Sequence, residues 1–234
     1  MNVAIILAGG TGSRVASEIP KQFIELSGQM MIMHSLKPFA ESIMVNAIQI
    51  VAGNEWRDKI EAEIYGGANQ ELRSKFGGFS DPGENRQMSI YNALKDVRES
   101  IGNIDGVIIH DAARPFVTVK DVDECLKTLE EHEGAMPVLP MNDTVYFSRN
   151  GKKVDELLNR NCIYAGQAPE AFRFDVYFKA NEELLPDKIL LIKGSTEPAI
   201  MAGLDVAMIP GNQLNFKVTT KEDLERAKER CDLN

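Results

Sequence analysis

Residues 3–14 read VAIILAGGTGSR, an apolar run that turns directly into a glycine-rich segment. The apolar residues from Val3 to Leu7 are nearly continuous rather than alternating, which is typical of a strand buried on both faces of a sheet. The glycines that follow allow backbone N–H groups to approach a ligand closely, because glycine has no Cβ. This stretch therefore predicts a buried strand followed by a loop at the edge of a sheet.

The rest of the chain alternates similar apolar runs with helix-like segments. Strand-like runs cover Val3–Leu7, Ala47–Val51, Gly106–His110, Ala135–Leu139 and Val206–Ile209. Helix-like segments cover Met30–Ala40, Asn54–Ile64, Arg86–Arg98 and Lys120–Glu131. This alternation predicts one α/β domain over residues 1–234, Rossmann-like, with a mostly parallel sheet and helices on both faces. In such sheets, ligands bind beyond the carboxyl ends of the strands.

Composition narrows the classes of function. The 234 residues are 44% hydrophobic, enough for a substantial core, and the formal net charge of −9 argues against a broad surface for nucleic acid or anionic membrane. The sequence shows no membrane span and no pattern of a secretory signal. The scattered cysteines Cys125, Cys162 and Cys231 suggest neither a disulfide framework nor a zinc site. We therefore expect a cytoplasmic protein that binds no nucleic acid and no membrane, and that holds any anionic ligand through local cations.

The segment from Thr144 to Leu157 interrupts the alternation. It places Asn150-Gly151 between two strand-like runs, and this dipeptide signals a β-hairpin because both positions tolerate the positive φ of a type I′ turn. A hairpin outside the main sheet would form an arm at about residues 143–167. Such an arm either decorates the surface or contacts another subunit.

A final helix is predicted near the end of the chain. Thr219-Thr220-Lys221-Glu222 resembles a capping box, in which a hydroxyl side chain and an acidic side chain three residues later close the first helical turn. Lys217 would then lie in the strand or turn just before this helix.

The glycine-rich loop fits some ligands better than others. Val15 stands where the last glycine of G-x-G-x-x-G belongs, so a dinucleotide-binding dehydrogenase is weakly supported, and no Gly-Lys-Ser/Thr follows to make a P-loop. Taken alone, the loop is also compatible with a plain tight turn. Arg14 and Lys21 favour a ligand-binding loop over a plain turn, because two cations beside exposed backbone N–H groups suit a nucleoside triphosphate with its magnesium ion.

Further motifs follow along the chain: Pro20-Lys21-Gln22-Phe23, Gly83 with Arg86 and Ser89, His110-Asp111-Ala112-Ala113-Arg114-Pro115, and Asn215-Phe216-Lys217-Val218-Thr219-Thr220. In this order they resemble the cytidylyltransferases that act on 2-C-methyl-D-erythritol 4-phosphate, a step of isoprenoid biosynthesis, and their relatives that act on ribitol 5-phosphate. The resemblance covers nearly the whole chain. It implies an enzyme that converts CTP and a polyol phosphate, with Mg²⁺ accompanying the CTP, into a CDP-polyol and pyrophosphate.

The resemblance also implies a role for individual residues. It implies that Arg14, Lys21 and Lys217 are catalytic and neutralise the negative charge of the phosphates. CTP binding falls to Leu7, Ala8, Gly9, Gly10, Thr11, Gly12, Gly83, Arg86, Ser89, Asp111 and Ala112, with Gly83 and Ser89 against the cytosine. Binding of the polyol phosphate falls to Asp111, Arg114, Thr144, Arg160 and Thr196. Thr144 and Arg160 lie on the predicted arm, so the resemblance implies a homodimer in which each arm reaches the partner's site. The metal ligands stay unassigned, and His110 is expected to be a packed strand-end residue rather than a base.

Two segments depart from the family pattern. Gln167-Ala168-Pro169-Glu170 replaces the usual Gln-Thr-Pro-Gln, and Ser195-Thr196-Glu197 is the nearest match to a usual Thr-Asp pair. Both belong to the acceptor side. Tyr164-Ala165-Gly166-Gln167 favours ribitol phosphate, whereas the alanine pair after Asp111 favours methylerythritol phosphate. Two other functions also stay open: a sugar-1-phosphate nucleotidyltransferase using another triphosphate, and a catalytically silent relative that binds CTP or a CDP-polyol.

Overall fold

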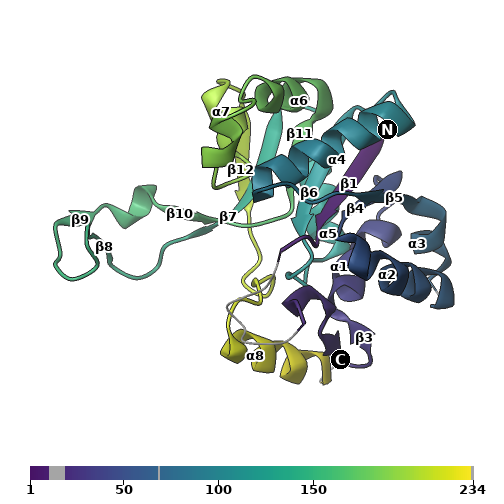
Figure 1. Ribbon diagram of the computed structural model, residues 1–234. Helices are drawn as coiled ribbons and strands as arrows, with labels where there is room; N and C mark the ends of the chain where they lie inside the picture. The colour runs from purple at the N-terminus through teal and green to yellow at the C-terminus, as the bar shows by residue number, and fades with distance from the viewer. Residues whose placement is uncertain (11–18, 68, 233–234) are drawn as a thin grey trace.

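The computed structural model describes residues 1–10, 19–67 and 69–232, and its centre is a twisted sheet (Figure 1). The strands of this sheet are β1 (Asn2–Leu7), β4 (Ala47–Val51), β5 (Phe76–Ser80), β6 (Gly106–Asp111), β7 (Gly134–Pro140), β10 (Tyr164–Gly166), β11 (Glu170–Arg173) and β12 (Val206–Pro210). Over the described residues the sheet order is β10-β7-β11-β6-β1-β4-β5, with β12 beside β7. Strands β5, β4, β1 and β6 run parallel, and so do β7 and β12, whereas β10 and β11 pair antiparallel with their neighbours. The predicted α/β fold with a mostly parallel central sheet is confirmed.

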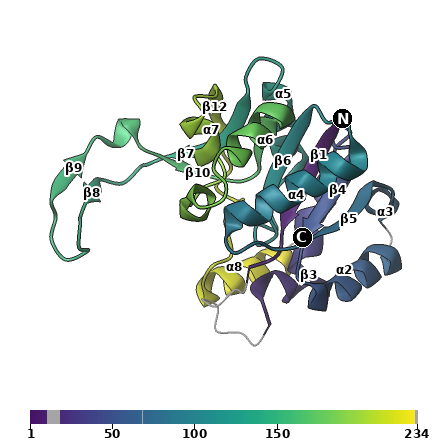
Figure 2. The same cartoon turned by 45° about the horizontal axis from the view of Figure 1, so that its top comes forward.

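Helices cover both faces of the sheet (Figure 2). On β1, Ala4 and Ile6 face one hydrophobic cluster and Val3 and Ile5 face the other, which explains why this strand is apolar throughout. The first cluster packs against α1 (Met31–Glu41), α2 (Asn54–Gly66), α3 (Gln70–Lys75) and α5 (Val119–Thr128). The second packs against α4 (Arg86–Ile101), α6 (Phe174–Glu182) and α7 (Glu197–Met201). Each fully buried aliphatic side chain in these layers contributes roughly 1.5–3 kcal/mol to folding.

The predicted strands and helices agree with the observed ones to within a few residues at their ends. Strands β5 and β11 were not predicted from the sequence. Strand β5 contains Gly77 and Gly78, which have low strand propensity, and its register against β4 shifts between Ile48 and Gln49. Strand β11 is a four-residue strand that follows Pro169, so it offers no periodic pattern to recognise.

The predicted arm is confirmed as a feature that projects from the sheet beyond β7 and β10 (Figure 1). Its strands β8 (Val145–Phe147) and β9 (Glu156–Leu158) pair antiparallel. The predicted type I′ turn is wrong, because the paired strands leave a longer loop at residues 148–155. In that loop Gly151 has a φ of 68°, while the side chain of Asn150 accepts hydrogen bonds from the backbone N–H groups of Lys152 and Lys153.

The predicted C-terminal helix is present as α8 (Lys221–Asp232). Its capping box lies one residue later than predicted. Asp223, not Glu222, accepts the backbone N–H of Thr220 at 2.9 Å, and the N–H of Asp223 donates to the Thr220 hydroxyl at 3.2 Å. Helix α8 packs through a third, small cluster onto β2 (Glu25–Leu26), which pairs antiparallel with β3 (Gln29–Met30).

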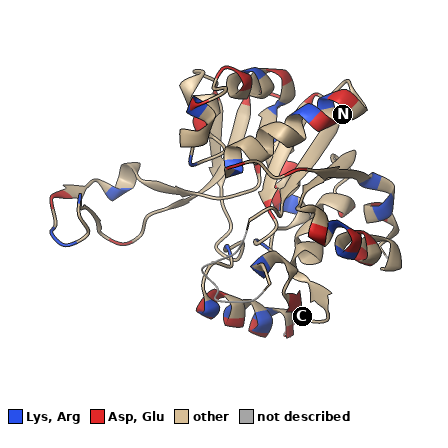
Figure 3. Cartoon of the chain, in the orientation of Figure 1, with Lys and Arg blue, Asp and Glu red and all other residues tan. Residues whose placement is uncertain are grey.

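Charged residues of both signs are interspersed along α2 and α8 and gather near the C-terminal end of α4 (Figure 3). The cysteines are free thiols, with Cys125 buried and Cys162 exposed on the arm. Among the described helices, none combines the length and the apolar character that crossing a bilayer requires.

Candidate active site

Three parallel strands end side by side at one edge of the sheet. In the register, Leu7 at the end of β1 pairs with Val51 on β4 and with Asp111 on β6. The chain extends the sheet from β1 toward β4 on one side and returns to β6 on the other, so β1 lies at a topological switch point. A cleft of about 470 Å³ opens there. The described residues that line it are Leu7, Gly9, Gly10, Lys21, Gln22, Val51, Gly83, Glu84, Asn85, Arg86, Ser89, Asp111, Ala113 and Lys217.

Two glycines in the cleft wall have no room for a side chain. A Cβ on Gly9 would lie 2.9 Å from side-chain atoms of Pro82, and a Cβ on Gly83 would lie 2.5 Å from the Met88 side chain. The N–H of Gly83 donates to the Ser89 hydroxyl at 2.9 Å. The glycine-rich loop and the turn before α4 therefore pack closely, which brings exposed backbone to the cleft.

The segment that carries Lys21 is anchored from two sides. It forms the short 3₁₀ helix η2 (Lys21–Phe23), in which Phe23 stacks on Trp56 with ring centroids 4.2 Å apart. The side-chain amide of Gln22 donates to the carbonyl oxygens of Ala8 and Gly10 at 2.6 and 2.7 Å. Gln22 thus ties the start of the glycine-rich loop to the Lys21 segment, a role that the sequence did not reveal although Gln22 lies in the Pro-Lys-Gln-Phe motif.

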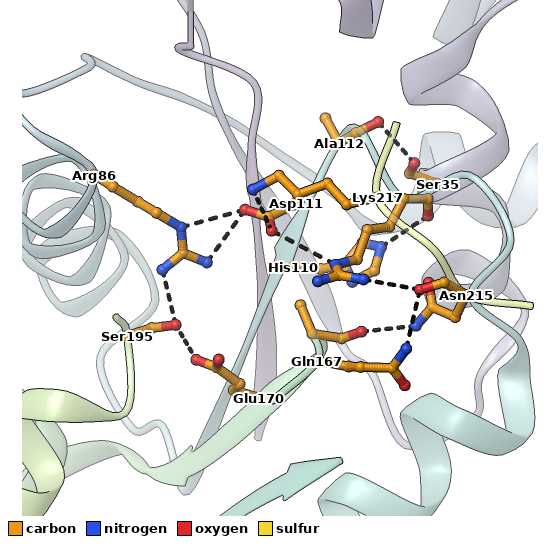
Figure 4. Close-up of polar contacts among 12 residues, drawn as sticks. Ser35, Arg86, His110, Asp111, Ala112, Gln167, Glu170, Ser195, Asn215 and Lys217 are labelled. Carbon is orange, nitrogen blue, oxygen red and sulfur yellow. Dashed lines mark hydrogen bonds and ion pairs between the residues drawn. The ribbon is translucent and has the colours of Figure 1, made fainter. Parts of the chain in front are cut away.

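A cluster of cations surrounds Asp111 (Figure 4). Its Oδ1 accepts from Arg86 Nε and Nη2 at 3.3 and 3.2 Å, and its Oδ2 accepts from Lys217 Nζ at 2.9 Å. Arg114 Nε lies 3.7 Å from Oδ2. Burial alone would raise the pKa of Asp111, but the attraction of Arg86, Lys217 and Arg114 holds it well below its usual range. Asp111 is therefore an ionised anchor that holds cations at the cleft.

Lys217 is placed by a buried hydrogen-bonded segment. Val218 beside it is fully buried, and the Asn215 amide donates to the carbonyl oxygen of Ala168 at 2.7 Å. Arg114 Nη1 donates to the carbonyl oxygen of Asn215 at 2.8 Å. These contacts explain the Asn-Phe-Lys-Val-Thr-Thr motif, because they fix the backbone on both sides of the lysine.

His110 is the packed strand-end residue that was expected. It is fully buried and lies beside Phe39, with ring centroids 5.1 Å apart. Its Nε2 lies 3.1 Å from the carbonyl oxygen of Arg114, a contact that assigns the proton to Nε2. Burial lowers the pKa of His110 to about 4, so the imidazole is neutral near pH 7 and supports the Arg114 turn.

Arg86 makes a second contact that the sequence did not predict. Its Nη1 donates to the Ser195 hydroxyl at 2.8 Å, and this hydroxyl donates to a carboxylate oxygen of Glu170 (Figure 4). Glu170 stood out in the sequence only as a departure from the family pattern. No local pattern joins it to Arg86, because the contact depends on the position of β11 beside β6.

Some predicted site residues lie elsewhere. Thr144 and Arg160 line a separate pocket on the arm, and Arg160 Nη1 donates to the carbonyl oxygen of Asn142. Thr196 is buried with its hydroxyl 3.4 Å from the sulfur of Met136. Ala8 and Ala112 are buried, and each lies between two residues of the chain that line the cleft. Arg14, Thr11 and Gly12 lie outside the described residues.

Comparison with known proteins identifies similar chains. The sequence model of the family described as "2-C-methyl-D-erythritol 4-phosphate cytidylyltransferase" matches residues 2–230. Proteins of that name from Thermotoga neapolitana and Petrotoga mobilis are 34% and 35% identical to this chain; the alignments cover 97% and 100% of it and 96% and 100% of the relatives. A crystal structure of 4-diphosphocytidyl-2C-methyl-D-erythritol synthase from Anaerococcus prevotii shares the fold at a TM-score of 0.83 and 21% identity, covering 99% of this chain and 96% of that one. The Francisella tularensis 2-C-methyl-D-erythritol 4-phosphate cytidylyltransferase structure has a TM-score of 0.79 at 25% identity, covering 98% and 99%.

Proposed function

Because this chain belongs to the 2-C-methyl-D-erythritol 4-phosphate cytidylyltransferase family, we propose that it transfers the cytidylyl group of CTP to 2-C-methyl-D-erythritol 4-phosphate. An oxygen of the acceptor phosphate attacks the α-phosphorus of CTP. The bond from the α-phosphorus to the oxygen that bridges to the β-phosphate breaks. The products are a CDP-alcohol, in which a diphosphate joins cytidine to methylerythritol, and pyrophosphate.

The observation that carries this proposal is the cation-lined cleft at the carboxyl edge of β1, β4 and β6. Phosphoryl transfer between two anions depends on positioning and charge neutralisation rather than on a covalent intermediate. Lys21, Arg86 and Lys217 line the cleft, where they can meet triphosphate and acceptor phosphate together. In this proposal Lys21 and Lys217 stabilise the charge of the transition state, and Arg14, outside the described residues, joins them.

Magnesium enters the proposal with the nucleotide. Within the described parts of the chain, no group of three histidine, cysteine, aspartate or glutamate side chains is placed to hold a metal ion. Asp111 is already paired with cations, so the described residues do not form a resident magnesium site. Mg²⁺ commonly binds substrate phosphates and keeps several waters, and we propose that it arrives on CTP.

We further propose that the chain acts as a homodimer in which the arm completes the partner's site. Tyr146, Val154 and Leu157 on the arm are more than half exposed, at 57%, 58% and 63%. A two-stranded ribbon with exposed apolar residues needs a packing partner to be stable in water. A two-fold dimer would supply that partner and would bring Thr144 and Arg160 toward the acceptor phosphate of the other subunit. We also propose a cytoplasmic location, which the free thiols support.

The test is pyrophosphate release by the purified protein with CTP and a panel of acceptors. We expect release with 2-C-methyl-D-erythritol 4-phosphate and much less with ribitol 5-phosphate or with sugar 1-phosphates. Turnover of ribitol 5-phosphate at a higher kcat/KM would identify the chain as a ribitol 5-phosphate cytidylyltransferase instead. Release with a sugar 1-phosphate and another triphosphate would assign the sugar nucleotidyltransferase function, and absence of turnover despite CTP binding would identify a silent relative.

A further inference from the structure

Glu170 is connected to the cation cluster through the hydroxyl group of Ser195 (Figure 4). Its carboxylate accepts from Ser195, and Ser195 accepts from Arg86 Nη1 at 2.8 Å. The opposite edge of the Arg86 guanidinium donates to Asp111, which in turn binds Lys217. A continuous path of hydrogen bonds therefore joins Glu170 to the lysine that faces the cleft.

The groups around Glu170 come from several neighbouring elements. Hydroxyl groups of Ser195 and Thr196 lie against its carboxylate. Among the described residues, the charged or titratable groups that interact electrostatically with Glu170 include Arg86 on α4, Asp111 at the end of β6, Arg114 in the next turn, Tyr177 on α6 and Cys125 on α5. Burial raises the pKa of both Tyr177 and Cys125 above their ordinary values. Both therefore keep their protons near neutral pH, while the arginines stay charged and Asp111 stays ionised.

Glu170 is the member of this set whose charge changes near neutral pH. Burial raises the pKa of Glu170 to about 7, and repulsion from Asp111 adds to this rise, whereas Arg86 and Arg114 oppose it. With a neutral Glu170, the three cations Arg86, Arg114 and Lys217 face one carboxylate. With an ionised Glu170 they face two, and the excess positive charge is halved.

We propose that Glu170 is a positioning residue that takes up a proton when a phosphate ligand binds at the cleft. The phosphates compete for Arg86 and Lys217 and add negative charge to the cluster. Both effects make an ionised Glu170 less favourable. Protonation then leaves the full excess positive charge to the ligand, while Ser195 still holds the Arg86 guanidinium in place. This role rests on the proposed function, because it concerns the phosphate-bearing ligands of the same cleft.

The proposal predicts the size of two measurable effects. If bound phosphates raise the pKa of Glu170 by about one from its value of about 7, binding at pH 7 takes up about 0.4 proton per site. The same linkage makes affinity about fivefold higher at about pH 6 than at about pH 8. Both effects should be absent when the carboxyl group is replaced by an amide of the same shape.

The probe is the proposed product, the CDP-alcohol of 2-C-methyl-D-erythritol, because its diphosphate bridge carries no titrating proton near neutral pH. Isothermal titration calorimetry in two buffers with different ionisation enthalpies gives the number of protons taken up by the whole protein. We expect uptake in the wild type and in Glu170→Asp, which keeps a carboxyl group, but none in Glu170→Gln. The matched control is Glu99→Gln, an exposed glutamate near the other end of the helix that carries Arg86, and it should behave as the wild type.

The outcomes separate this role from the proposed function. Binding without proton uptake in the wild type, or uptake that persists in a folded Glu170→Gln variant, would overturn the role of Glu170 and leave the proposed function intact. If Glu170→Gln does not fold, the pH dependence of proton uptake by the wild type tests the role of Glu170. That uptake must peak just above pH 7 and fall toward zero in acid and in alkali, and any other pH dependence would overturn the role. Failure of the wild type to bind the probe at any pH would overturn both.

Discussion

Replacing Asp111 by asparagine should destabilise the fold strongly, because the change removes the charge that holds three cations together. Asp111 contacts Lys217 at 2.9 Å, Arg86 at 3.2 Å and Arg114 at 3.7 Å, and its side chain is only 11% exposed. An asparagine side chain at this position keeps the size and one oxygen acceptor but cannot balance these charges. Arg86 and Arg114, which are themselves largely buried side chains, would then lie close to Lys217 with no ionised partner at the centre.

The expected loss follows from the burial of the cluster. At an effective dielectric constant of about 20, each of these contacts is a gross attraction of roughly 5 kcal/mol, most of which the desolvation of the ions offsets. Removing one partner from a buried ion pair leaves an uncompensated charge and typically costs about 3–5 kcal/mol. With a urea dependence of about 3 kcal/mol per molar, the unfolding midpoint would fall by roughly 1–1.7 M.

The assay is urea unfolding followed by circular dichroism at a fixed protein concentration, since association would shift the midpoint. The matched control is Asp105→Asn at the other end of β6, where the carboxylate is 76% exposed and pairs with the N-terminal ammonium group; its cost should stay below about 1 kcal/mol. Because the folded pKa of Asp111 is lowered, its stabilisation is complete above the unfolded pKa and is lost only as pH falls through the folded value. Titration of Asp111 itself therefore leaves the difference from wild type unchanged between mildly acidic and neutral pH. Glu170 adds a smaller pH dependence, because repulsion from Asp111 helps to raise its pKa; the loss should be somewhat smaller near neutral pH, where Glu170 ionises more readily in the variant, than in mild acid. A loss below about 1 kcal/mol for Asp111→Asn would refute the anchor role.

Three further outcomes are expected. Lys21→Ala should lower kcat by about a hundredfold or more without changing the melting temperature, while the exposed Lys37→Ala should leave both unchanged; normal pyrophosphate release by a folded Lys21→Ala protein would remove the lysine from the catalytic site. CTP should exceed UTP, ATP and GTP by more than about tenfold in kcat/KM, and equal values for UTP would show that the wall near Ser89 does not read the cytosine amino group. Mixing inactive Arg160→Ala and Lys21→Ala subunits should restore about a quarter of wild-type activity, since half of the randomly formed dimers carry one complete site; no recovery despite proven subunit exchange would place Arg160 outside the partner's site.

The sequence predicted the parts of the fold that repeat a simple pattern. The central strands are buried on both faces, so their apolar runs were visible, and their parallel alignment placed Leu7 and Asp111 at one edge. Lys21 and Lys217 were predicted as partners only through the family resemblance, since 196 positions separate them. The capping box was displaced by one residue because Glu222 and Asp223 are both acidic, and only the backbone geometry decides which of them accepts the Thr220 N–H.

What the sequence did not predict depends on tertiary contacts. Strand β11 inserts antiparallel between β6 and β7, and this insertion brings Glu170 next to Ser195. The hydrogen bonds from the Gln22 side chain to the glycine-rich loop likewise could not be predicted from the sequence. The arm was predicted, but the length of its loop was not. Asn150 and Gly151 do not form a two-residue turn, because the side chain of Asn150 accepts hydrogen bonds from the backbone N–H groups of Lys152 and Lys153 within a longer loop.

The Asp111 cluster has a consequence for binding that follows from its charges. A chain with a net charge of −9 attracts anions only where cations exceed carboxylates locally, and here Arg86, Arg114 and Lys217 outnumber the carboxyl groups of Asp111 and Glu170. Asp111 holds these cations in position before a ligand arrives, so little reorganisation is needed when phosphate charge develops beside them. The same carboxylate also competes with the ligand for Lys217 and Arg86, which moderates affinity. A cluster with this balance favours the transition state, in which negative charge shifts from the attacking phosphate toward the leaving pyrophosphate while the net charge at the cleft stays that of the two bound substrates.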